Sequence, residues 1–214
     1  MDAIGQPDDL ASRLWAMNRD QAQACLEHPF VRGLAAGTLP LEAFRRYVGQ
    51  DAYFLEAFAR AYAFALARSP DREGLEAFHR LIGGVLEELQ LHAGYAAAWQ
   101  VDLSGVEPAA ATLAYTDFLL ATAGASGTVG EICAAMAPCM RLYAYLGQRL
   151  ASEGGARADN PFGEWIATYS SDEFEALAST LEGLLNRYAA DTPPVRAAYR
   201  RAMRLERAFF DAAC

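Results

Sequence analysis

The segment PLEAFRRYVGQDAYFLEAFARAYAFALAR, residues 40–68, has the apolar spacing of one long helix. Pro40 suits the first turn of a helix, where its missing N–H leaves no hydrogen bond unmade. Beyond it, large side chains recur at steps of three and four residues: Phe44, Tyr47, Val48, Phe54, Leu55 and Phe58. Asp51 follows the same spacing. One face of this helix is therefore expected to be buried against other helices.

The rest of the chain continues this helical pattern. The composition is 53% hydrophobic, and alanine and leucine far outnumber valine and isoleucine, which favours helices over strands. Glycine and proline clusters predict helices near residues 10–27, 29–37, 71–99, 108–123, 161–169 and 171–190, one around Cys139, and a last one after residue 191. We expect an all-α protein in which residues 1–214 form a single-domain bundle of eight or nine helices.

The charged residues argue against several classes of function. The net charge is −9, and all 18 basic residues are arginines scattered along the chain. Without lysine the chain cannot form a Schiff base, anchor pyridoxal phosphate or build a P-loop. A phosphate backbone would be repelled over most of the surface, so no nucleic-acid partner is expected.

The cysteines and the apolar runs bear on location. Four cysteines without zinc-site spacing, and no secretory leader, predict reduced thiols in a cytoplasmic protein. No apolar run approaches the roughly 20 residues that span a bilayer. We therefore expect a protein without membrane association.

A proline and a cysteine interrupt the segment AAMAPCMRLYAYLG, residues 134–147. Pro138 removes a backbone donor inside an expected helix, which predicts a kink beside the Cys139 thiol. Tyr143 lies four residues further on and shares the helical face of Cys139. Two interpretations remain open, since Cys139 could be a reactive thiol or a small buried hydrophobe.

Two acidic residues lie among aromatic side chains. Asp51 occupies a core-like helical face, where a carboxylate is costly to bury unless a polar group meets it. Glu206, in RLERAFF, precedes Phe209 and Phe210, and could equally be an exposed partner of a neighbouring arginine. Functional tyrosines could include Tyr115 and Tyr169, which are otherwise ordinary core residues.

The histidines do not predict a metal centre. Glu76 and His79 have the Glu-x-x-His spacing of di-metal bundles, but the second pair that such a centre needs is missing. His92 follows Glu88 by four residues, the spacing of a hydrogen-bonded helical pair. We expect neither a metal nor a cofactor.

Six segments together resemble the TenA (thiaminase II) family, in order and in spacing. They are HPFVRGLAAGTLPLEAFRRYVGQDAYFLEAFARA, EELQLH, TLAYTDFL, APCMRLYAYLG, WIATYSSDEF and RLERAFFDAA, and they cover nearly the whole chain. The resemblance implies a haem oxygenase-like helical bundle. It also implies a cofactor-free hydrolysis that releases 4-amino-5-hydroxymethyl-2-methylpyrimidine from thiamine, or from 4-amino-5-aminomethyl-2-methylpyrimidine in thiamine salvage.

The resemblance assigns roles residue by residue. The cysteine after the motif proline is the nucleophile in the family branch that carries one, and it matches Cys139. The acid of the early long helix, which contacts the pyrimidine ring nitrogen and amine, matches Asp51, and the late glutamate that transfers protons matches Glu206. Residues that line and orient the site match Phe54, Tyr115, Tyr143 and Tyr169. Family members are commonly homotetramers, so a homo-oligomer is expected.

The chain departs from the family pattern at three positions. Phe54 stands where many members carry tyrosine, Arg141 where an aromatic residue is frequent, and Phe210 where tryptophan is common. These differences affect the expected substrate preference more than the expected reaction. Two other functions remain open: a cofactorless oxidase of the same fold, similar to the pyrroloquinoline quinone synthases, and a non-catalytic regulatory protein.

Overall fold

The computed structural model describes residues 9–99, 103, 105–125 and 127–214, apart from the side chains of residues 91, 92, 95 and 97–99. Within these residues the chain forms ten α-helices and no strand. They are α1 (Leu10–Ala16), α2 (Arg19–Leu26), α3 (Pro29–Ala36), α4 (Leu41–Arg68), α5 (Arg72–Trp99), α6 (Ala110–Gly124), α7 (Val129–Ser152), α8 (Gly163–Tyr169), α9 (Asp172–Tyr188) and α10 (Pro193–Ala213). The all-α prediction is confirmed.

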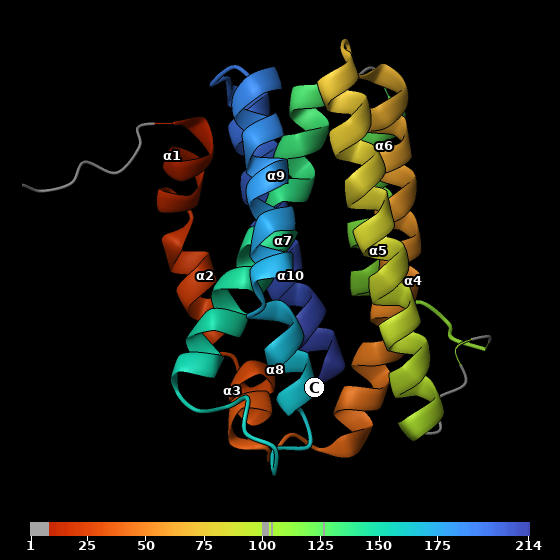
Figure 1. Cartoon of the computed structure of the whole chain (residues 1–214), viewed down its shortest axis with the longest axis vertical. Coiled ribbons are helices and arrows are strands. Elements are labelled where there is room, and N and C mark those ends of the chain that lie inside the picture. The colour runs from red at the N-terminus through yellow and green to blue at the C-terminus, as the bar shows by residue number, and fades with distance from the viewer. Residues whose placement is uncertain (1–8, 100–102, 104, 126) are drawn as a thin grey trace, which may run out of the picture.

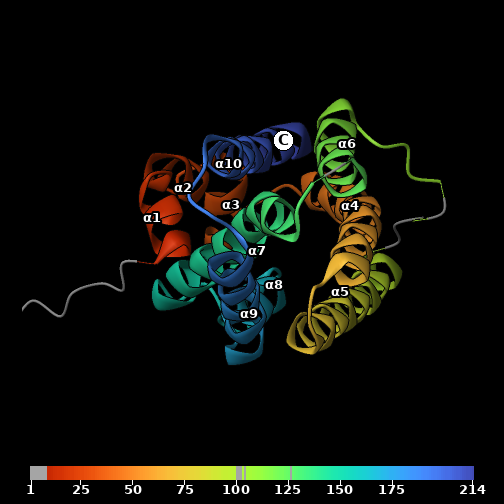
Figure 2. The same ribbon diagram turned by 90° about the horizontal axis from the view of Figure 1, so that it is seen from above.

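The long helices form two groups that face one another. Figure 1 shows α4, α5 and α6 running side by side, with α7, α9 and α10 beside them, and the same grouping is clear from above in Figure 2. Helix α7 packs against α9, α10, α8, α6 and α4, so it is the centre of the bundle. The short helices α1, α2 and α3 cover the outer side of α10 and α9.

Helix α7 has the sequence of a buried central helix. A capping box at Thr128 and Glu131 fixes its first turn, since the Thr128 hydroxyl accepts from the Glu131 N–H and the Glu131 carboxylate accepts from the Thr128 N–H. The helix continues through Pro138 without interruption as far as Ser152. A Cβ at Gly147 would lie 2.4 Å from the backbone of Tyr169, so this glycine allows the end of α8 to approach α7 closely.

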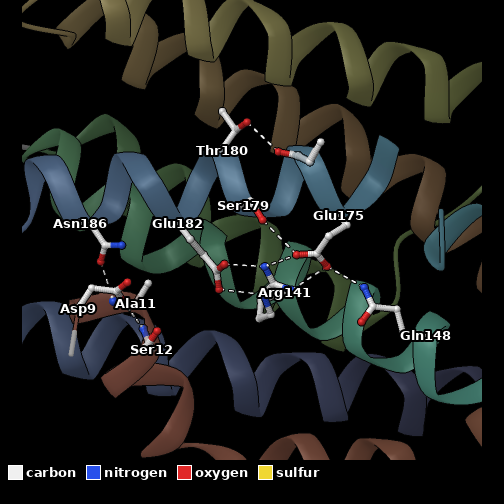
Figure 3. A network of polar contacts seen from close by, with 11 residues as sticks. Asp9, Ala11, Ser12, Arg141, Gln148, Glu175, Ser179, Thr180, Glu182 and Asn186 are labelled. Carbon is white, nitrogen blue, oxygen red and sulfur yellow. Dashed lines mark hydrogen bonds and ion pairs between the residues drawn. The ribbon is translucent and has the colours of Figure 1, made fainter. Parts of the chain in front are cut away.

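A charged cluster ties α7 to α9 on the side away from α4. The Arg141 guanidinium donates to Glu182 at 2.8 Å and to Glu175 at 2.9 Å, and Gln148 also donates to Glu175 (Figure 3). Bidentate arginine–carboxylate pairs have a fixed geometry, which favours one register between the two helices. The arginine that departs from the family pattern is therefore explained by its carboxylate partners on α9.

The structure corrects two helix boundaries. The helix expected over residues 10–27 is divided at Met17 and Asn18, where the Asn18 side chain donates to the Leu14 carbonyl and Asn18 is the N-cap residue that precedes α2. Helix α8 begins at Gly163 rather than at Pro161, because the Asn160 side chain accepts from the Phe162 N–H and donates to Leu34, which holds residues 160–162 in a turn.

The arginines are less evenly spread over the surface than expected. Helix α10 alone exposes five of them: Arg196, Arg200, Arg201, Arg204 and Arg207.

No helix in the described part of the chain is both long enough and apolar enough to cross a bilayer. The buried apolar side chains form one continuous cluster that includes residues of all ten helices, Phe54, Tyr115 and Cys139 among them.

Candidate active site

Polar contacts join three helices in the interior. Tyr115 of α6 donates from its phenol to Oε1 of Glu206 on α10 at 2.6 Å. The thiol of Cys139 on α7 lies close to the same carboxyl group and interacts with it. Glu206 is 1% exposed and Cys139 is 9% exposed, so both lie in the core. The structure thus brings together the predicted nucleophile and the predicted proton-transfer residue.

Burial sets the protonation of Glu206. The loss of hydration raises the pKa of its carboxyl from 4.5 to about 7, and the charge of Asp51 adds to this effect. The bonds from Tyr115 and Cys139 act in the opposite direction and lower it. A carboxyl group with a pKa near 7 can both accept and return a proton at neutral pH.

Cys139 is a protonated thiol in this environment. Burial raises its pKa well above 9, and the nearby charges of Glu206, Glu88 and Asp51 raise it further. Reactive cysteines in many enzymes have a lowered pKa and are thiolates before the substrate binds. A thiol in this state would need a base in order to react as a thiolate, and the carboxyl group of Glu206 lies beside it.

Asp51 is a third acidic group in this region, after the Glu206 carboxyl and the Cys139 thiol. It lies on the buried face of α4 and is 4% exposed. Its charge acts on Glu206, Cys139 and the phenols of Tyr47 and Tyr143, so it lies in the same region of the core. The expectation that this face of α4 buries an acid among aromatic residues is confirmed.

Aromatic rings surround the three acidic groups. On one side, Phe54 lies 4.7 Å from Tyr115 and 5.8 Å from Phe209, centroid to centroid. On the other, Tyr143 and Tyr169 meet edge to face at 4.9 Å. All four predicted lining residues are therefore buried around the same region. Such rings could hold a flat heterocycle by stacking.

Three residues with polar groups in this region were not predicted from the sequence: Tyr47, Trp165 and Glu88. Tyr47 donates to the Tyr143 hydroxyl at 3.4 Å and accepts from Trp165 Nε1 at 3.2 Å. Glu88 of α5 accepts a hydrogen bond from the Tyr169 phenol. A signal for Glu88 existed, because it lies in the EELQLH segment, but the sequence suggested His92 as its partner. The side chain of His92 lies outside the described residues.

The possible metal ligands lie elsewhere. Glu76 and His79 line a surface groove between α5 and α9, together with Arg80 and Glu173. In the described part of the chain, no three His, Cys, Asp or Glu side chains are grouped so that they could hold an ion.

Comparisons with known proteins place this architecture in a family. The TENA/THI-4/PQQC family model matches residues 15–214. The chain belongs to this family. The predicted resemblance is thereby confirmed.

Relatives within the TENA/THI-4/PQQC family carry enzymatic names. The chain is 34% identical to an aminopyrimidine aminohydrolase of Halalkalibacterium halodurans over 201 residues, which cover 89% of each protein. It is 36% identical to the bifunctional TH2 protein of Arabidopsis thaliana over 95% of this chain, but spans 37% of that longer protein.

Solved structures confirm the fold of this family member. A TenA family protein from a Silicibacter species, described as a transcription regulator, superposes with a TM-score of 0.87 at 33% identity and covers 97% of both chains. A haem oxygenase from Synechocystis superposes with a TM-score of 0.64 at 17% identity, over 95% of this chain and 91% of that one. The haem oxygenase-like bundle expected from the sequence is confirmed.

Proposed function

We propose that this protein hydrolyses the C–N bond at the methylene group of 4-amino-5-aminomethyl-2-methylpyrimidine or of thiamine, and releases 4-amino-5-hydroxymethyl-2-methylpyrimidine. The observation that carries the proposal is the buried contact between the Cys139 thiol and Glu206, with Tyr115 on the same carboxyl group. Relatives named aminopyrimidine aminohydrolase support the class of enzyme.

In the first step, sulfur adds to an electron-poor carbon of the pyrimidine ring. Glu206 accepts the thiol proton as the sulfur–carbon bond forms, and the displaced electron pair moves to a ring nitrogen. Asp51 binds the ring nitrogen and amine of the heterocycle, which keeps the reacting carbon next to sulfur. This role for Glu206 agrees with a carboxyl pKa of about 7.

In the second step, the electron pair returns through the ring and breaks the bond from the methylene to the leaving nitrogen. A leaving amine takes the proton from Glu206. The thiazole of thiamine leaves as a neutral molecule without a proton, so in that case Glu206 releases its proton to solvent. Water then adds to the methylene and gives a proton to Glu206. Loss of sulfur restores the aromatic ring, and the departing thiolate takes this proton from Glu206 to become the thiol again. The net change is one water consumed for one alcohol and one leaving group, with one proton released in addition when the substrate is thiamine.

The charges around Cys139 favour this substrate over a polyanion. The ionisable groups that act on the thiol are the carboxyls of Glu206, Glu88 and Asp51. A quinone precursor with several carboxylates would be repelled by them, whereas an aminopyrimidine offers hydrogen-bond donors and basic nitrogens. This difference supports the hydrolase over the cofactorless oxidase.

The test is substitution of the nucleophile with a matched cysteine control. Cys139→Ala is expected to abolish release of the hydroxymethylpyrimidine from both substrates, measured by chromatography of the product. Cys133→Ala removes another buried thiol from the same helix and should retain turnover. Unchanged turnover in Cys139→Ala, with a normal circular dichroism spectrum, would remove the thiol from the mechanism.

A further inference from the structure

Glu88 lies between the surface and the aromatic wall of the proposed active site. It belongs to α5, a helix that carries none of the residues assigned to the reaction above. On its outer side it lines a hollow of about 220 Å³ between α5 and the start of α9, which Phe174 and Leu177 also line. On its inner side it accepts the hydrogen bond from the Tyr169 phenol.

The buried phenol of Tyr169 requires a hydrogen-bond acceptor. It ends α8, a helix of seven residues, and it is buried. Its ring contacts Tyr143 at 4.9 Å and Phe174 at 4.9 Å, both edge to face. Ring contacts alone leave a buried phenol without an acceptor, which is unfavourable by itself. The Glu88 carboxylate supplies that acceptor.

The hydrogen bond connects the two groups of helices. Helix α5 packs on α4, which carries Asp51 and Phe54, whereas α8 packs on α7, which carries Cys139. The contact between Glu88 and Tyr169 thus fixes the position of the aromatic residues beside α7 relative to the side chains that α4 contributes to the site. A bond to a charged acceptor is stronger than a neutral one, so it can hold this distance.

We infer that Glu88 is a positioning residue of the proposed active site. Its hydrogen bond fixes the Tyr169 ring where that ring lines the binding site of the heterocycle, and its side chain separates this site from the outer hollow. The inference rests on the proposed function. Glu88 positions the heterocycle through Tyr169, and its charge also acts on the Cys139 thiol, but it does not itself exchange protons with the substrate.

The experiment is a double-mutant cycle with turnover and binding as readouts. Glu88→Ala and Tyr169→Phe should each raise the KM for thiamine by roughly tenfold or more, because each removes a hydrogen bond to a charged group. The double variant should be little worse than either single variant, since both remove the same contact. Affinity for the neutral product, followed by tryptophan fluorescence, should fall in parallel.

Two further variants separate positioning from a merely structural role. Glu88→Gln keeps an acceptor for Tyr169 and should restore most of the KM. Because the Glu88 charge also raises the pKa of Cys139, this variant should move the alkaline limb of the kcat/KM profile to lower pH, which Tyr169→Phe should not do. Glu87→Ala removes the adjacent carboxylate that lines the same hollow and should leave KM unchanged.

The outcomes distinguish this inference from the proposed function. A wild-type KM in Glu88→Ala, or additive effects of the two single substitutions, would overturn the positioning role while the hydrolase proposal stands. If the wild-type protein neither turns over thiamine nor binds the product, the proposed function fails, and the positioning role fails with it.

Discussion

Replacing Glu206 with glutamine should change how stability depends on pH. The folded protein holds this carboxyl at a pKa of about 7, against 4.5 for an unhindered glutamate. Between these two values the folded state therefore binds more protons than the unfolded state, and the free energy of unfolding falls as pH rises. The favourable contribution is complete below about pH 4.5 and is lost above about pH 7.

The size of the effect follows from the same two values. A pKa difference of about 2.5 corresponds to ~3 kcal/mol in the free energy of unfolding. Glu206→Gln retains a side-chain oxygen that can accept from Tyr115 and Cys139, but it cannot ionise. The wild-type protein should thus lose ~3 kcal/mol relative to Glu206→Gln between pH 4.5 and pH 8. Urea unfolding followed by circular dichroism at fixed protein concentration measures this.

Glu175→Gln provides a control of opposite sign. The pKa of Glu175 is lowered by its bonds to Arg141, although burial acts to raise it, so its contribution exists above pH 4.5 and is lost as pH falls. This variant should be less stable than the wild type at neutral pH and approach it in acid. A difference between wild type and Glu206→Gln that stays constant over this range would refute the assigned ionisation of Glu206.

Three further predictions concern the site and its support. Asp51→Asn should raise the KM for thiamine by roughly 10- to 100-fold with a smaller change in kcat, since a charge-assisted contact is worth about 1.5–3 kcal/mol; an unaltered KM would argue against that contact. Tyr115→Phe removes a bond that lowers the pKa of Glu206, so the acidic limb of the kcat/KM profile should move to higher pH, and an unmoved limb would disprove the coupling. Arg141→Met leaves two carboxylates of α9 close together and should reduce the free energy of unfolding by ~2–3 kcal/mol at pH 7, measured in urea.

Most of the fold could be predicted because its signals are local. The apolar periodicity from Phe44 to Phe58 depends on side chains one turn apart, and α4 extends from Leu41 to Arg68 as the spacing indicates. Ser171 could likewise be predicted as the N-cap residue of α9, and its hydroxyl accepts from the Phe174 N–H. The break at Asn18 depends on a single side-chain bond to the Leu14 carbonyl, which composition does not reveal.

The site could be predicted in part, for a related reason. Asp51 and Glu206 stand out because an acid among aromatic residues contradicts the pattern around it, and both are buried. Glu88 has no such contrast, and its partner Tyr169 is 81 residues further along the chain. A contact between residues so far apart in the sequence depends on how α8 packs on α7 and so comes to face α5. No local sequence pattern contains that information.

Protonation states are the least accessible to sequence, and here they bear on the mechanism. The pattern around Pro138 and Cys139 suggests a reactive cysteine, for which a lowered pKa would be the usual expectation. Instead, burial and the carboxyls of Glu206, Glu88 and Asp51 raise the pKa of the thiol. The negative charges that disfavour a thiolate at Cys139 also favour the binding of a positive charge. A basic heterocycle bound beside Asp51 would therefore offset the negative charge of these carboxylates and lower the pKa of the thiol. In the proposed mechanism, substrate binding would thus favour ionisation of the thiol, and the thiol would stay protonated while no substrate is bound.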